Sequence, residues 1–230
     1  MNNQDFFPKR DDIWRAAIVS TIAHATWVAQ HPLLAYEQSW TDHVYSIQDS
    51  QGTRGSIAFM DKYTLGAFFD SESPFNPFSE NNLLGDDYDS DRFFYGMPSQ
   101  LDPLKDEVLL FLLDEYKGET IPIITTSFWS ISEMIDAATS WSDVVRNGMH
   151  VLVDRIGNLE SVLEKLRSNY EFQDDQVDLI RTLFQKKILE PERIIYLQKH
   201  EWEILISKGH EGIEESRELL YSIGIIAPTI

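Results

Sequence analysis

The most concentrated group of chemically active side chains in this 230-residue chain is the run Asp86, Asp87, Asp89 and Asp91. If the run is aligned as an EF-hand calcium loop that begins at Asp87, acids fill the first, third and fifth positions. Arg92 then stands where the loop needs glycine, and Pro98 where it needs a bidentate glutamate. The pattern therefore excludes an EF-hand and favours a solvated charge run without metal. A loosely held divalent cation stays open as an alternative.

Histidines and nucleophiles show no recognisable catalytic pattern. Six histidines occur, none of them in an HExxH or HxH motif. His24 and His31 lie two helical turns apart, which is about 10 Å along a helix axis and too far to share one metal ion. The chain has no cysteine, no GxSxG elbow, no GxxxxGK[ST] phosphate loop and no GxGxxG fingerprint. The sequence thus predicts a non-enzymatic protein with no catalytic residue, metal ligand or cofactor.

Acidic residues outnumber basic ones by 38 to 19, and the formal net charge is −19 at pH 7. Nucleic-acid binding requires clustered cations that displace counterions from phosphates, and no such cluster of Lys and Arg appears. Nucleic acid is therefore excluded as a partner. The hydrophobic fraction of 43% is sufficient for a folded core and excludes a disordered chain. The charge favours a basic protein as the partner.

Six of these net negative charges lie between Asp70 and Arg92, in a segment rich in aromatic residues. Prolines and glycines interrupt every apolar run over residues 70–99, and loops of this length are usually functional or disordered. Aromatic side chains anchor interfaces, and charges around them steer an oppositely charged partner. In the alternative, the rings fold back to fill the gap between two lobes, and only the acids face solvent. The predicted partner-binding residues of this loop are Phe75, Phe78, Asp86, Asp87, Tyr88, Asp89 and Asp91.

A second acidic surface is predicted on the last helix. Its acids lie within about two turns, and only Arg217 opposes them. The alternative is an ordinary solvated helix face. The predicted partner-binding residues here are Glu211, Glu214, Glu215 and Glu218.

The sequence pattern predicts an α+β fold for the elements that position these residues. It consists of an N-terminal helix with a small antiparallel sheet, the long acidic loop, and a mainly helical C-terminal half. Residue spacing predicts a helix over 11–30 and a three-stranded meander over 39–48, 55–60 and 63–69. A helix over 102–116 and a buried strand over 121–126 follow. The chain is then predicted to be helical from a capping box at Ser130 and Glu133 onward, with helices over 158–169, 174–189, 191–207 and 211–223.

We expect a single domain over residues 1–230, with two lobes at 1–99 and 100–230. The first residues lack the basic region and apolar run of a secretory signal. No apolar stretch approaches the roughly 20 residues that cross a bilayer. The expected location is the cytoplasm, without a membrane partner.

This profile of an acidic, cysteine-free chain with an aromatic and acidic loop resembles the immunity proteins of bacterial polymorphic and contact-dependent toxin systems. The resemblance is one of composition and carries over no motif. It implies a protein that binds a cognate toxin domain, often a basic nuclease, and blocks its active site or an essential surface. One alternative is a hydrolytic enzyme with an acid/base or loosely bound metal site between the lobes, using His24 or His43 near the loop carboxylates. The other is a regulatory domain that binds a basic segment of another protein.

Overall fold

The computed structural model describes residues 7–85 and 87–228. It confirms the α+β class: the main sheet is antiparallel and has the strand order β1-β2-β3-β4-β7. The chain folds as two units, of which unit 1 comprises Met1–Ile13 and His43–Val153, and unit 2 comprises Trp14–Asp42 and Asp154–Ile230. Both units are discontinuous in sequence, so they do not follow the boundary between residues 99 and 100 that was expected for the lobes.

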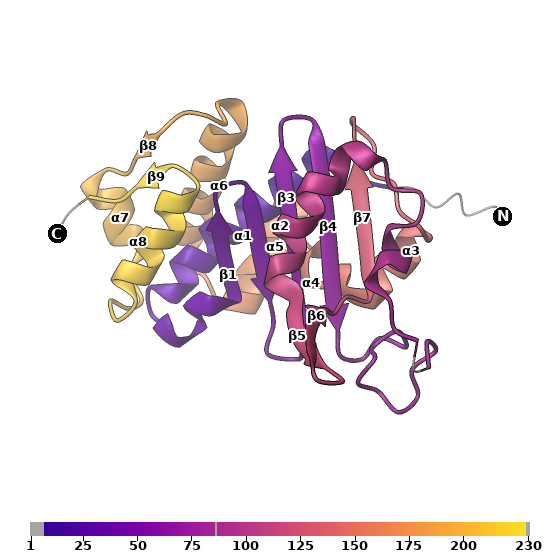
Figure 1. The fold of residues 1–230 in the computed structure, drawn as a ribbon. Helices are drawn as coiled ribbons and strands as arrows, with labels where there is room; N and C mark the ends of the chain where they lie inside the picture. The colour runs from indigo at the N-terminus through magenta and orange to yellow at the C-terminus, as the bar shows by residue number, and fades with distance from the viewer. Residues whose placement is uncertain (1–6, 86, 229–230) are drawn as a thin grey trace. The chain divides into compact units, whose positions relative to one another are not determined.

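The elements are labelled as in Figure 1. The strands are β1 (Gln38–Thr41), β2 (Val44–Gln48), β3 (Thr53–Met60), β4 (Tyr63–Asp70), β5 (Leu113–Tyr116), β6 (Glu119–Pro122), β7 (Thr126–Ser130), β8 (Ile195–Tyr196) and β9 (Ile225–Ile226). The α-helices are α1 (Arg10–Val28), α2 (Asp102–Leu109), α3 (Trp141–Val144), α4 (His150–Val153), α5 (Leu159–Tyr170), α6 (Asp174–Leu189), α7 (Lys199–Leu205) and α8 (Ile213–Ser222). Short 3₁₀ turns are η1 (Pro32–Glu37), η2 (Ser90–Phe94), η3 (Ser99–Leu101) and η4 (Leu110–Leu112), and η5 (Val145–Met149) is a π-helical turn.

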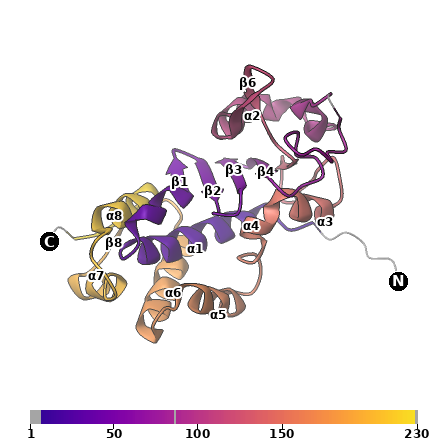
Figure 2. The ribbon, with the colours of Figure 1, turned by 90° about the horizontal axis from the view of Figure 1, so that it is seen from below.

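Unit 1 has helices on both faces of its strands, with α2 on one face and α3 and α4 on the other (Figures 1 and 2). The α2 face is formed by residues in cross-strand register, Ala58 opposite Leu65 and Leu65 opposite Trp129. Leu104 and Val108 of α2 belong to the same buried cluster. Because side chains alternate along a strand, the intervening residues point to the other face.

On that second face, two phenylalanines lie against glycines of the neighbouring strand. Phe68 is in register with Gly55, and Phe128 with Gly66. A Cβ atom on Gly55 would lie 2.1 Å from the Phe68 ring, and one on Gly66 would lie 2.5 Å from the Phe128 ring. The two rings are stacked with centroids 6.1 Å apart. The missing side chains of the glycines thus provide the space that the rings fill.

Unit 2 is organised around the part of α1 that follows Trp14. Its buried apolar residues, such as Ile22 and Val28, form one core with α5, α6, α7 and α8, and this core includes the fully buried Trp202. The segment before α8 approaches α1 closely: the Gly212 N–H donates to the Ala29 carbonyl at 3.0 Å. A Cβ atom at Gly212 would lie 2.0 Å from the Val28 carbonyl oxygen, so only glycine fits there.

The predicted strand over residues 39–48 is wrong in one respect: it is divided into β1 and β2 by a turn at Asp42, whose φ is 52°. The predicted helix over 102–116 is also too long, because α2 ends at Leu109. After the 3₁₀ turn η4 the chain forms the β5–β6 hairpin, whose turn residues Lys117 and Gly118 have φ of 52° and 85°. Two consecutive positive φ angles favour a tight hairpin turn rather than helix termination.

The predictions for residues 121–135 are wrong as well. The strand expected over 121–126 is absent, because β6 ends at Pro122 and β7 begins only at Thr126. Ser130, expected to cap a helix, is the last residue of β7; the next helix begins at Trp141, capped by Ser140.

The helix expected over 191–207 is shortened to α7, because β8 pairs with β9 in parallel.

We predict that Gly55→Ala lowers the free energy of unfolding by about 1–3 kcal/mol, because the added methyl group overlaps the Phe68 ring. Urea denaturation measures the loss. In the background of Phe68→Leu, which leaves more space, the same substitution should cost less. Equal costs in the two backgrounds would show that the Gly55–Phe68 contact is not the cause.

Candidate functional site

The aromatic residues of the acidic loop mostly face the core of unit 1. Phe75 and Tyr88 pack against the cluster that α2 covers, and the Phe75 ring meets Phe93 edge to face at 6.0 Å. Tyr95 and Phe78 are the exceptions, with 83% and 48% of their surfaces exposed, although the Phe78 ring also contacts Phe69 and Tyr116. Of the predicted aromatic anchors, Phe78 is thus the one with a large accessible face.

Tyr88 has a structural role that the sequence did not indicate. Its hydroxyl donates to the Ile124 carbonyl at 2.9 Å and accepts from the Ile124 N–H at 2.6 Å. Burial raises the pKa of the Tyr88 phenol, so the hydroxyl keeps its proton. The two hydrogen bonds of Tyr88 connect the acidic loop to the segment between β6 and β7.

The loop acids differ in how far they are engaged. Asp87 and Asp89 are exposed. Asp89 caps η2 by accepting from the Asp91 N–H, and Asp91 pairs with Lys105 at 2.6 Å. Asp86 lies outside the described residues. Within residues 7–85 and 87–228, no group of three His, Asp or Glu side chains is placed to hold a metal ion.

The acids predicted on the last helix all belong to unit 2. The helix begins at Ile213 and not at Glu211 as predicted, so Glu211 precedes α8. Glu214 pairs with Arg217 at 3.1 Å. The Glu211 carboxylate accepts from its own N–H and that of His210, and these hydrogen bonds hold the pKa of Glu211 below its usual value. Glu215 and Glu218 have no ion-pair partner among the described residues.

Glu215 and Glu218 line a groove of about 220 Å³, which we call the α8 groove. Its other walls come from the segment of η1 and β1 and from the buried side of α8. The Trp40 indole at the groove is held by a hydrogen bond from its Nε1 to the Thr21 hydroxyl at 2.9 Å. The lining residues are Ala35, Gln38, Ser39, Trp40, Glu215, Glu218, Leu219 and Ser222.

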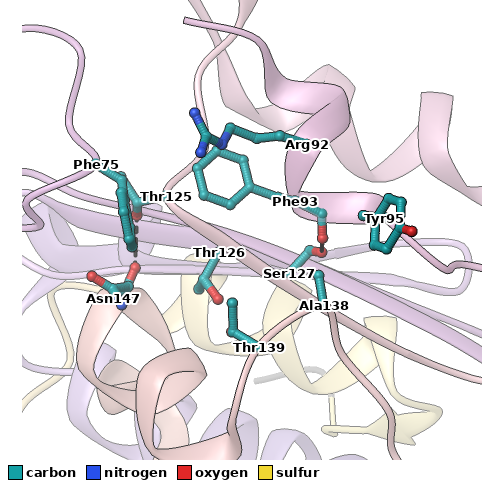
Figure 3. Close-up of a pocket in the computed structure, with 10 residues that line it drawn as sticks. All are labelled: Phe75, Arg92, Phe93, Tyr95, Thr125, Thr126, Ser127, Ala138, Thr139 and Asn147. Carbon is teal, nitrogen blue, oxygen red and sulfur yellow. Dashed lines mark hydrogen bonds between the residues drawn. The ribbon is translucent and has the colours of Figure 1, made fainter. Parts of the chain in front are cut away.

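Unit 1 contains a larger cavity, of about 370 Å³, that the sequence did not predict (Figure 3). Four separate segments form it: the acidic loop, η2, the start of β7, and the region from Ala138 to η5. Threonine, serine and asparagine supply its polar groups, and phenylalanines supply its apolar wall. The lining residues are Phe75, Arg92, Phe93, Tyr95, Thr125, Thr126, Ser127, Ala138, Thr139 and Asn147.

Asn147 organises the floor of this cavity. The Asn147 backbone carbonyl accepts a hydrogen bond from the Thr125 hydroxyl at 2.6 Å. Its side-chain oxygen accepts one from the Ser73 hydroxyl at 2.7 Å, and its side-chain nitrogen donates one to the Asp143 carbonyl at 2.8 Å. Asn147 (φ −100°, ψ 19°) and Gly148 (φ 151°) break the helical geometry of η5. The segment is therefore a kink between α3 and α4 rather than a continuous π-helix. The Asn-Gly pair was the one local signal in the sequence that could have marked this position.

His24 and His43, the residues of the enzyme alternative, have different surroundings from those it required. His24 is fully buried in unit 2, and its Nε2 donates to the Leu34 carbonyl at 3.0 Å. Desolvation lowers the pKa of His24 to about 4, assisted by the charge of Arg155 and opposed by that hydrogen bond. His43 Nε2 in unit 1 lies 2.7 Å from Oε2 of Glu107 in α2. The carboxylate beside His43 thus belongs to a helix and not to the acidic loop.

We predict that His24 makes the protein less stable as the pH falls from 6.5 to 4. In this window the unfolded chain binds a proton at His24 and the native state does not, so the free energy of unfolding falls, by about 3 kcal/mol over the window. In His24→Gln, an amide can still donate to Leu34 but cannot titrate, so urea denaturation at pH 7 and pH 4 should show a smaller loss. His200→Gln, at an exposed site, should keep the wild-type loss. Identical losses in wild type and His24→Gln would contradict the assignment.

We predict that Tyr88→Phe lowers the free energy of unfolding by about 1–3 kcal/mol, because the N–H and carbonyl of Ile124 lose their partner. Thermal or urea denaturation measures it. Tyr116→Phe is the matched control: it keeps the ring contacts of Tyr116 and should change stability by less than about 0.5 kcal/mol. A neutral Tyr88→Phe would return Tyr88 to the set of binding residues.

No helix in the described part of the chain is long and apolar enough to cross a membrane. Comparison with protein-family models, with curated proteins and with solved structures gives no match. The α8 groove, the loop acids and the unit 1 cavity are therefore the features from which a function can be inferred.

Proposed function

We propose that this protein is a non-enzymatic binding protein that docks a basic protein partner, and that it acts as an immunity protein by neutralising a cognate toxin domain of the basic, nuclease type. The observation that carries the proposal is the α8 groove, where Glu215 and Glu218 lie without an ion-pair partner among the described residues. The two carboxylates are three residues apart on one helix, and like charges at that spacing repel each other. A cation from a partner would relieve this repulsion.

The other walls of the α8 groove suit an arginine side chain. A guanidinium can donate to two carboxylates and stack on an aromatic face at the same time, whereas an ammonium is a point charge. Trp40 supplies the aromatic surface and Leu219 the apolar contact for the aliphatic stem. The hydrogen bond from Trp40 to Thr21 fixes the indole in advance, so less side-chain entropy is lost on binding.

Exposed aromatic area beside the groove favours a protein over a small cation as the ligand. Tyr221 is 71% exposed and lines a neighbouring depression together with Glu218. Large aromatic side chains of this kind are the usual anchors of protein interfaces. Tyr221 and the two carboxylates thus combine an anchor with an orienting charge.

Charge over the whole chain supports the type of partner. A net charge of −19 attracts a cationic protein at long range and raises the association rate at low salt. A nuclease domain must be cationic where it holds phosphates, so its substrate surface is the natural target. In unit 1, the exposed Asp87 and Asp89 add to this attraction without contributing a groove.

The experiment begins by placing a photo-crosslinking residue at Ser222, which lines the α8 groove, in the full chain expressed in its native cells. The crosslinked protein is identified, purified and tested for toxicity and for nuclease activity with and without the chain. A toxic basic nuclease that one equivalent of the chain inhibits supports the proposal. A harmless protein with a basic segment would replace it by the regulatory alternative, and a neutral or acidic partner would overturn both.

We predict that Glu215→Gln/Glu218→Gln weakens binding to the purified partner by about tenfold or more, because paired charge-assisted hydrogen bonds are lost. Calorimetry at low and high salt measures this, and wild-type affinity should fall as salt rises. Glu164→Gln/Glu192→Gln, on exposed positions outside the groove, removes the same charge and should reduce affinity much less. Equal losses in the two variants would mean that only net charge, and not the α8 groove, contributes.

A further inference from the structure

We propose that the unit 1 cavity is a binding site for a small organic anion, in which a carboxylate or phosphate group is attached to a flat apolar body. This site is independent of the α8 groove and of the basic partner. Its volume of about 370 Å³ lies within the range of small-molecule sites, and its mixture of apolar wall and few polar groups is typical of them.

Arg92 is the first reason for a negative ligand. No Asp or Glu is among the described residues that line the cavity, although acids outnumber bases twofold in the chain. Arg92 has no ion pair among the described residues, and its guanidinium lies 6.0 Å from the centre of the Phe93 ring. The adjacent Asp91 is already paired with Lys105. In contrast, carboxylates pair with Arg10, Arg54, Arg146, Arg167, Arg181, Arg193 and Arg217.

Thr126 is the second and independent reason. Its side chain lines the cavity, and its hydroxyl makes no hydrogen bond to the described residues although the residue as a whole is only 3% exposed. The hydroxyls on either side are both engaged: Thr125 donates to the Asn147 carbonyl, and Ser127 donates to the Phe93 carbonyl at 2.6 Å. The Thr126 hydroxyl is not one of the fully buried groups that lack a partner, so it can donate from the cavity wall to an oxygen of a ligand.

Asn147 adds a further donor. Its amide nitrogen uses one hydrogen on the Asp143 carbonyl, which leaves the second N–H for a ligand oxygen. Figure 3 shows Arg92 on one side of the cavity and Asn147 and Thr126 on the other. These three residues line the cavity and each carries a donor group, which suits an anionic group with several acceptor oxygens.

The apolar wall defines the rest of the ligand. Phe75 and Phe93 meet edge to face, with centroids 6.0 Å apart and planes at 68°. Because the two rings already touch, a flat apolar group would pack beside them rather than between them. The ligand class is therefore an aromatic or similarly flat carboxylate or phosphate ester.

The test uses the full-length protein, labelled with ¹⁵N, and three probes: benzoate, phenyl phosphate and the neutral isostere benzamide, each up to about 50 mM. We expect saturable chemical-shift changes at the amides of Thr126 and Asn147 with an anionic probe, and at least about tenfold weaker binding of benzamide. Whichever anion binds more tightly identifies the carboxylate or phosphate class. Equal binding of benzamide, or no saturable change at these amides with any probe, overturns the proposal.

Two variants keep the test specific. Arg92→Gln should abolish the preference for anions over benzamide, and Thr126→Val, which keeps the side-chain shape, should weaken anion binding about fivefold. Arg146→Gln is the matched control, because this exposed arginine pairs with Asp143 and does not line the cavity. A preference that survives in Arg92→Gln would also overturn the proposal. Binding of a basic protein at the α8 groove should be unaffected in these variants, so the two proposals fail separately.

Discussion

Close packing of Phe68 against two glycines is the contact on which much of unit 1 depends. Gly55 lies beneath the Phe68 ring within the sheet, and Gly148 of η5 approaches Phe68 from outside it. Any side chain at Gly148 would hold η5 away from β4, because its Cβ would lie 2.5 Å from that of Phe68. The close approach allows the neighbouring Asn147 carbonyl to accept from Thr125, and so sets the floor of the cavity. A packing requirement of the core thus decides where the polar groups of the cavity lie.

The two proposed sites have opposite charge preferences, and each belongs to a single unit. In unit 2, Glu215 and Glu218 offer two negative charges beside an aromatic ring. In unit 1, Arg92 is the cation at a cavity without described acids. Net charge alone would have assigned the same preference to the whole molecule. Ion pairs explain the difference, because they neutralise many acids locally, for example Asp91 by Lys105 and Glu214 by Arg217, and the remaining unpaired groups determine each site.

Local signals predicted some elements well and others poorly. The helices predicted over residues 158–169 and 174–189 are confirmed as α5 and α6, because their caps and apolar spacing are encoded within each segment. The helix over 102–116 was too long because Leu113–Tyr116 pairs with Glu119–Pro122, and a hairpin can override a helical pattern. The loop acids were identified from sequence, but Tyr88 was assigned to binding although its hydroxyl is bonded to Ile124.

By itself, the sequence determined the α+β class, the large acidic excess and the lack of a recognisable catalytic motif, since these follow from composition and short-range patterns. Tertiary structure alone decided which charges remain unpaired and which polar groups meet. Arg92, Thr126 and Asn147 come from three separate segments, and Trp40 lies far in sequence from Glu218. Their convergence depends on long-range packing around Phe68 in unit 1 and around α1 in unit 2, which no local propensity encodes.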